Sequence, residues 1–188
     1  MILLDPDLDR DLAAAAKSAG PSPASASSRA HRLPSARTLA RFLTQAQAAV
    51  RLSGQVTVLL TTDAAIRRLN RQFRGKNKPT DVLSFPSDFP GPERIAGDLA
   101  ISVPTALRQA VEHGHALTVE IKVLILHGLL HLAGYDHEND TGQMARRERL
   151  IRARLGLPQG LIERTGAELN PSRRSGATPR PSTRGQRS

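Results

Sequence analysis

The sequence predicts an α+β domain in which a small sheet of about four strands is packed with about five helices. Five segments repeat apolar residues at helical spacing, and short runs rich in Val, Leu, Ile and Thr lie between them. The elements follow the order helix, strand, helix, two strands and three helices, which is typical of helices packed on one small sheet. The length of 188 residues and the apolar content of 39% suit a single core.

Apolar spacing and capping residues define the individual elements. Leu39, Phe42 and Leu43 share a helical face behind Ser35, which is a candidate N-cap. Asp63 is a candidate N-cap of the second helix. The predicted helices are 35–50, 63–73, 104–113, 118–132 and 141–155, and the predicted strands are 55–61, 81–85 and 98–102, with residues 1–4 as a further edge strand.

The net charge of +10 favours a polyanionic partner, such as nucleic acid or an acidic membrane surface. Half of this excess lies in residues 169–188, which hold five Arg and no acidic residue. We predict three parts: an N-terminal segment over 1–34 with an Ala/Ser/Pro-rich linker, a folded domain over 35–168, and a disordered Arg-rich tail over 169–188. The tail is either a solubilising segment or a nonspecific RNA tether.

The composition excludes several functional classes. The absence of cysteine excludes a disulfide partner, a thiolate zinc site and a cysteine nucleophile. Four Phe and one Tyr are too few for an aromatic platform that stacks single-stranded bases. No apolar run reaches the roughly 20 residues of a membrane span, and the first residues, MILLDPDLDRDL, contain no basic leader. We therefore expect a cytoplasmic protein without a membrane partner.

Three of the six histidines fall within HGLLHLAGYDH, residues 127–137. His127 and His131 are four residues apart on the predicted central helix, so both imidazoles project from one face. Gly134 permits a left-handed turn that can bring His137 toward the same point. Three neutral nitrogens with one open position are the ligand set of a catalytic zinc site, and we predict one Zn²⁺ per chain. Nickel or copper would also accept imidazole.

The spacing H-x-x-x-H-x-x-G-x-x-H is also that of the metzincin proteases. Their general base is the Glu that follows the first His, and that position is Gly128 here. A metalloprotease is therefore a disfavoured alternative. Asp136 and Glu138 flank His137 and are candidate bases, although turn or surface acids are the favoured interpretation of both.

Other polar residues near this cluster favour structural roles. Glu148 shares a helical face with Met144 and could support a histidine, but a partly exposed helix acid is the favoured interpretation. His113 and His115 bracket a glycine at a helix end, where a surface cap is favoured over a metal ligand.

The histidine segment resembles the signature of the YbeY endoribonucleases, the rRNA maturation factors of bacteria. Two further blocks stand in the family's order: LNRQFRGKNKPTDVLSFP at Leu69–Pro86 and GDLAI at Gly97–Ile101. The resemblance covers about Ser35–Pro158 and implies nothing about the linker or the tail.

This resemblance implies a single-strand-specific, zinc-dependent endoribonuclease. The implied role is processing of the 3′ end of the small-subunit (16S) ribosomal RNA, with ribosome maturation and quality control, and the implied partners are ribosomal RNA and the small ribosomal subunit. Carried onto this sequence, the zinc ligands are His127, His131 and His137, and the functionally important arginine is Arg74. The resemblance also implies a mixed four-stranded sheet with a groove beside the zinc.

Residues 67–78, RRLNRQFRGKNK, hold six basic side chains and no acid. A solvated helix face explains Arg67, Arg68 and Arg71 as well as RNA binding does. In contrast, Arg74, Lys76 and Lys78 fall at a Gly-containing loop of the kind that often carries function. We predict that Arg71, Arg74, Lys76 and Lys78 bind RNA, with Arg74 donating paired hydrogen bonds to the scissile phosphate. The hypothesis is that a zinc-activated water attacks this phosphate.

A non-catalytic ribosome assembly factor with a structural zinc would explain the basic charge equally well. In that case, removing the metal would unfold the domain, whereas in an enzyme it would only stop cleavage.

Overall fold

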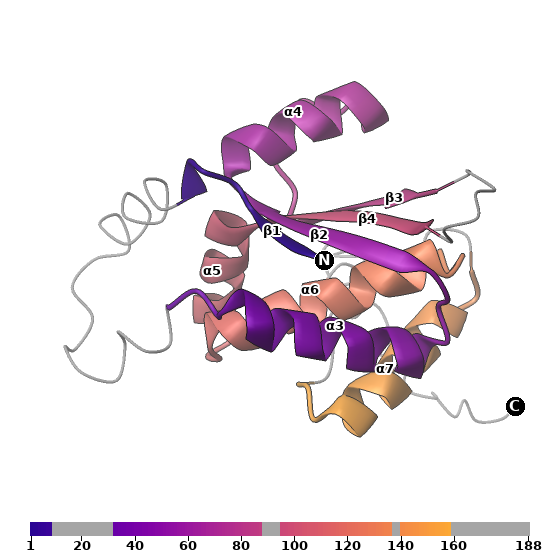
Figure 1. Cartoon of the computed structure of the whole chain (residues 1–188). Helices are drawn as coiled ribbons and strands as arrows, with labels where there is room; N and C mark the ends of the chain where they lie inside the picture. The colour runs from indigo at the N-terminus through magenta and orange to yellow at the C-terminus, as the bar shows by residue number, and fades with distance from the viewer. Residues whose placement is uncertain (9–31, 88–94, 137–139, 159–188) are drawn as a thin grey trace, which may run out of the picture.

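The computed structural model describes residues 1–8, 32–87, 95–136 and 140–158. Within these ranges the chain forms five helices and one four-stranded mixed sheet, which confirms the predicted α+β class. Helix α4 covers one face of the sheet, and the other helices form a layer on the opposite face (Figure 1). The Ala/Ser/Pro-rich linker and the Arg-rich tail lie outside the described residues, and the boundaries of the folded domain stay a prediction.

The sheet has the order β1-β2-β4-β3, with β1 and β3 at its edges. The N-terminal strand lies parallel to β2, β2 lies parallel to β4, and β3 pairs antiparallel with β4. The strand β3 begins one residue later than predicted because the Asp81 carboxylate accepts a hydrogen bond from the backbone N–H of Val82 and shapes the turn before it. The bounds are β1 Ile2–Leu4, β2 Gln55–Thr61, β3 Val82–Pro86 and β4 Ile95–Ser102.

The helices begin at capping residues that satisfy their first backbone N–H groups. Ser35 caps α3 as predicted, because its hydroxyl accepts from Thr38 N at 3.2 Å. The predicted cap Asp63 is wrong: the hydroxyl of Thr62 accepts from Ala65 N, and Asp63 is the first helical residue. The bounds are α3 Ala36–Val50, α4 Asp63–Arg74, α5 Val103–Glu112, α6 Leu117–Leu132 and α7 Gln143–Leu155.

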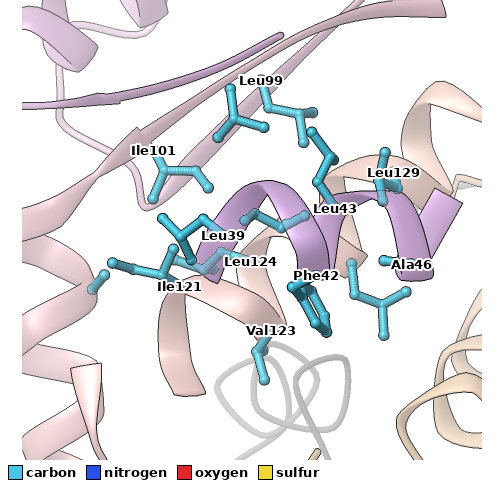
Figure 2. Close-up of a cluster of buried hydrophobic side chains, with 14 of the residues drawn as sticks. Leu39, Phe42, Leu43, Ala46, Leu99, Ile101, Ile121, Val123, Leu124 and Leu129 are labelled. Atoms are coloured by element: carbon cyan, nitrogen blue, oxygen red, sulfur yellow. The ribbon is translucent and has the colours of Figure 1, made fainter. Parts of the chain in front are cut away.

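The alternation of side chains along the strands divides the core between the two faces of the sheet. Leu99 and Ile101 of β4 point toward the layer of α3 and α6, where they join a large cluster that includes Leu39 and Leu124 (Figure 2). Ala100, between them, faces α4 in a smaller cluster. Each fully buried Leu or Ile contributes about 1.5–3 kcal/mol to the free energy of unfolding. The larger cluster therefore holds α6 in place.

Helix α6 is the central helix, as its apolar sequence predicts. Val123, Leu124, Ile125 and Leu126 are consecutive and therefore point to different sides of the helix, and all four are 0% exposed. In the part of the chain that the structure describes, no single helix is long and apolar enough to cross a membrane, and α5 and α6 pass that test only as a pair bent by 113°.

Candidate functional site

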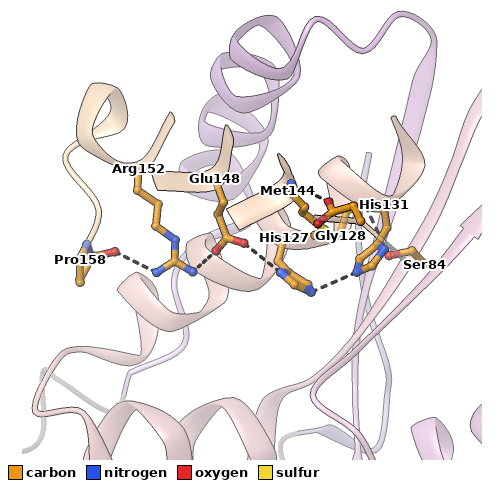
Figure 3. A network of polar contacts seen from close by, with 9 residues as sticks. Ser84, His127, Gly128, His131, Met144, Glu148, Arg152 and Pro158 are labelled. Carbon is orange, nitrogen blue, oxygen red and sulfur yellow. Dashed lines mark hydrogen bonds and ion pairs between the residues drawn. The ribbon is translucent and has the colours of Figure 1, made fainter. Parts of the chain in front are cut away.

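Helix α6 presents His127 and His131 on one face near its C-terminal end. The Nε2 atoms of the two rings lie 3.2 Å apart, and the ring planes are inclined at 73° (Figure 3). Two nitrogens bound to one tetrahedral zinc at about 2.0–2.1 Å are about 3.3 Å apart. The spacing of this histidine pair therefore fits two ligands of one metal ion.

A buried carboxylate on α7 holds the first histidine from behind. The Nδ1–H of His127 donates to Oε2 of Glu148 at 3.2 Å, and the neutral ring then carries its lone pair on Nε2, the atom that faces His131. A carboxylate in this position orients a metal-binding imidazole and raises its basicity. The expectation of a partly exposed acid is wrong, because Glu148 is 2% exposed.

The Glu148 carboxylate is itself balanced by a buried arginine. Arg152 pairs with Glu148 from one helical turn away, is 1% exposed, and donates from Nη1 to the Pro158 carbonyl at 2.9 Å (Figure 3). Burial raises the pKa of Glu148, but the hydrogen bonds from His127 and Arg152 and the positive charge of Arg152 together lower it by more, so that this pKa lies below its ordinary value. Glu148 is therefore ionised at neutral pH and accepts a hydrogen bond from the Nδ1–H group of His127.

The chain turns directly after the histidine pair. Gly134 has φ 86, and the backbone N–H groups of Gly134 and Tyr135 donate to the carbonyls of His131 and Leu130. This confirms the predicted left-handed turn. His137 and Glu138 lie outside the described residues, so the third ligand stays a prediction.

Gly128 marks a close approach of α6 to the sheet. A Cβ atom at Gly128 would lie 2.7 Å from Cδ2 of Leu99 and 3.2 Å from Oγ of Ser84. The Gly128 carbonyl also accepts a hydrogen bond from the Ser84 hydroxyl at 3.4 Å. The side of α6 where a metzincin carries its Glu therefore faces the sheet, and a longer side chain has no room there.

A basic surface forms at the end of α4 and in the loop that follows it. Asn70 is buried, and its Nδ2 donates to the Lys78 carbonyl at 2.7 Å, which ties the loop to the helix. Gly75 ends the helix at φ 69. We define the basic surface by its six exposed cationic residues, which are Arg67, Arg68, Arg71, Arg74, Lys76 and Lys78.

The basic surface and the histidine pair lie on opposite faces of edge strand β3. Phe85 contacts Phe73 of α4, with ring centroids 5.0 Å apart, while the preceding residue, Ser84, contacts Gly128 of α6. Arg74 follows Phe73 in the chain, and His127 precedes Gly128. Both groups of residues therefore come to the same level of β3, one on each side of the sheet.

A second histidine group lies at the turn between α5 and α6. One ligand atom from each of His113, His115 and Glu120 can be chosen so that all three lie within 4.8 Å of one another. This His-His-Glu group could hold a metal ion, whereas the sequence favoured a surface cap for the two histidines.

Comparisons with known proteins point to one family. The sequence model of the family described as Endoribonuclease YbeY matches residues 26–156. A Koribacter versatilis protein named Endoribonuclease YbeY is 52% identical over 131 residues, which cover 70% of this chain and 84% of that protein. A protein of the same name from Solibacter usitatus is 54% identical over 124 residues, covering 66% and 82% of the two chains.

Proposed function

The chain belongs to the YbeY endoribonuclease family, and we propose that it is a zinc-dependent, single-strand-specific endoribonuclease that processes the 3′ end of small-subunit ribosomal RNA. The observation that carries this proposal is the histidine pair on α6, with its two Nε2 atoms 3.2 Å apart. The names of the relatives support hydrolysis of RNA, and the donor atoms of the pair support the metal.

The residues on α6 fit a zinc ion by their chemistry as well as their spacing. His127, His131 and, from the sequence, His137 would hold the ion, and all three are imidazole ligands of the kind that zinc prefers. A zinc ion bound there supplies Lewis acidity that activates water for attack on a phosphodiester. Glu148 keeps the Nδ1 proton of His127 in place and thereby keeps Nε2 as the ligand atom.

The basic surface supports binding of a polynucleotide by its phosphates. The Arg74 guanidinium presents paired donors that match a phosphate group, and Lys76 and Lys78 add charge in the same loop. Binding through such charges weakens as the salt concentration rises. We propose that the bound RNA strand contacts the basic surface and then crosses the edge of β3 to reach the histidine pair.

This path gives a physical reason for single-strand specificity. Phe73, next to Arg74, and Gly128, next to His127, contact opposite sides of β3, so a nucleic acid that reaches both groups would bend sharply around the edge of the sheet. A duplex is too stiff for such a bend, since the persistence length of double-stranded DNA is on the order of 150 base pairs. A single strand bends freely. We place this reaction in the cytoplasm, on the small ribosomal subunit.

The test uses the purified full chain with single-stranded and double-stranded fragments of small-subunit ribosomal RNA. We expect one zinc ion at the α6 histidines, cleavage of the single strand only, and loss of that zinc ion and of cleavage in His131→Ala. Cleavage at the wild-type rate by His131→Ala protein that holds no zinc at the α6 histidines would overturn the metal-dependent mechanism.

The same protein distinguishes an enzyme from an assembly factor with a structural zinc. The apolar cluster between the sheet, α3 and α6 holds α6 in place without a metal ligand among its members. Removal of zinc by a chelator should therefore stop cleavage and leave the helical circular dichroism signal in place. Unfolding on chelation would instead support the structural role.

A further inference from the structure

We propose that His113, His115 and Glu120 form a second metal site, separate from the α6 histidine pair, which binds a divalent ion such as zinc at the turn between α5 and α6. The geometric basis is that three ligand atoms, one from each side chain, lie within 4.8 Å of one another. Two imidazoles and one carboxylate suit zinc and related divalent transition metals.

The backbone of the turn holds these residues close together. The N–H of His113 donates to the Gln109 carbonyl and the N–H of His115 donates to the Ala110 carbonyl, both at 3.0 Å. Gly114, between the two histidines, has φ 67, which an ordinary residue adopts only with strain. The two rings consequently stack, with centroids 5.8 Å apart and planes inclined by 17°.

The first histidine is already oriented by a hydrogen bond of the kind found behind metal ligands. The Nδ1–H of His113 donates to the Gln109 carbonyl. In the neutral ring this places the lone pair on Nε2, and a carbonyl behind an imidazole is a common outer partner in metal sites. The His113 side chain lies at the exposed end of α5, so it can adjust its position around an ion.

The carboxylate of the group is deeply buried. Glu120 lies in the first turn of α6, is 0% exposed, and has Oε2 at 3.0 Å from Nε2 of His115. A divalent ion bound between Glu120 and His115 would place positive charge next to this carboxylate, whose burial removes its own charge from water at a cost. The observed 3.0 Å separation is close to the about 3.3 Å between two ligands of a tetrahedral zinc ion.

A metal ion at this position would stabilise the turn by crosslinking α5 and α6. All three ligands lie within residues 113–120, where the chain bends by 113° between α5 and α6. The ion would connect the end of α5 to the first turn of α6. Because it would bind the folded chain in preference to the unfolded chain, it would raise the free energy of unfolding as its concentration rises.

Zinc stoichiometry and affinity test this site, with ZnCl₂ titrated calorimetrically into the metal-free full chain. His113→Ala removes an exposed ligand, so the variant should fold. We expect it to bind one zinc equivalent fewer than the wild type, or to bind that equivalent at least tenfold more weakly. Glu112→Gln changes the exposed neighbouring residue and should bind like the wild type.

Two further measurements separate this site from the proposed active site. His113→Ala should cleave single-stranded RNA at the wild-type rate, whereas His131→Ala should lose cleavage and keep the equivalent that His113 binds. The double variant His113→Ala/His131→Ala should lose both equivalents. Equal zinc stoichiometry and affinity in the wild type and His113→Ala would overturn the second site and leave the proposed ribonuclease function untouched.

Discussion

Replacement of Glu148 by glutamine should lower both the stability of the domain and its affinity for zinc. In the native protein the carboxylate lies between His127 and Arg152 and is 2% exposed, while Arg152 is 1% exposed. In Glu148→Gln the Arg152 guanidinium faces a neutral amide in the interior. Removing one partner of a buried ion pair lowers the free energy of unfolding by about 3–5 kcal/mol.

The loss of zinc affinity has a different cause, which a double variant isolates. Removing the carboxylate behind a ligating histidine typically weakens metal binding by about 10–100-fold. In Glu148→Leu/Arg152→Met both charges are gone, and replacing a buried ion pair by apolar residues is often neutral or stabilising. The double variant should therefore recover most of the stability and still bind zinc weakly at the α6 histidines, because His127 has lost its Nδ1 partner.

Urea unfolding of the metal-free full chain measures the first effect, and competition with a zinc-binding dye measures the second. Glu112→Gln removes an exposed acid and is the matched control, with an expected change within about 0.5 kcal/mol. Zinc affinity in Glu148→Gln equal to that of the wild type would refute the role of Glu148 in orienting His127. Full recovery of zinc affinity in the double variant would refute it as well.

Three further predictions concern the packing of α6, the basic surface and acid stability. Gly128→Ala should lower the free energy of unfolding by about 1–3 kcal/mol in urea titrations, because the new Cβ would lie 2.7 Å from Leu99; unchanged stability would contradict this close approach. Arg74→Ala should weaken single-stranded RNA binding and reduce the slope of log affinity against log salt by about 0.7, while the exposed Arg149→Ala on α7 should leave both unchanged. Burial raises the pKa of Asp63, but hydrogen bonds from two hydroxyls and from Arg108 lower it more, so this pKa lies below its ordinary value. The contribution of Asp63 to stability is therefore present above the unfolded-state pKa of about 3.9 and is lost as the pH falls through the depressed folded-state pKa. In Asp63→Asn the free energy of unfolding, measured by urea titration, should fall less steeply with decreasing pH in this acid range. The same pH dependence in the variant and the wild type would contradict that role.

Much of the fold could be predicted from local signals. The N-cap at Ser35, the strand Gln55–Thr61 and the buried helix ending at Leu132 all follow from capping chemistry and apolar spacing. The N-cap prediction failed at α4, where two residues that can each cap a helix, Thr62 and Asp63, are adjacent. Thr62 caps α4 because Asp63 is engaged elsewhere, accepting hydrogen bonds from hydroxyls on a distant part of the chain.

The burial of Glu148 and Arg152 behind the histidine pair could not be predicted from such local signals. Glu148 is 21 residues from His127 in the sequence, and its helix has a polar composition that favours exposure. Its burial follows only when α7 packs against α6 and Arg152 balances its charge. An i,i+4 Glu–Arg pair next to apolar neighbours is the one local signal that could have suggested it.

The sequence by itself determined the family and the chemistry of the candidate metal ligands. His127 and His131 share a helical face because the helix repeats every 3.6 residues, and this periodicity is a local property. The tertiary structure alone decided that Gly128 touches the sheet, that Glu148 reaches His127, and that the basic surface lies across β3 from the histidines. These relations depend on contacts between segments far apart in the chain, which hydrophobic burial selects and which no local pattern encodes.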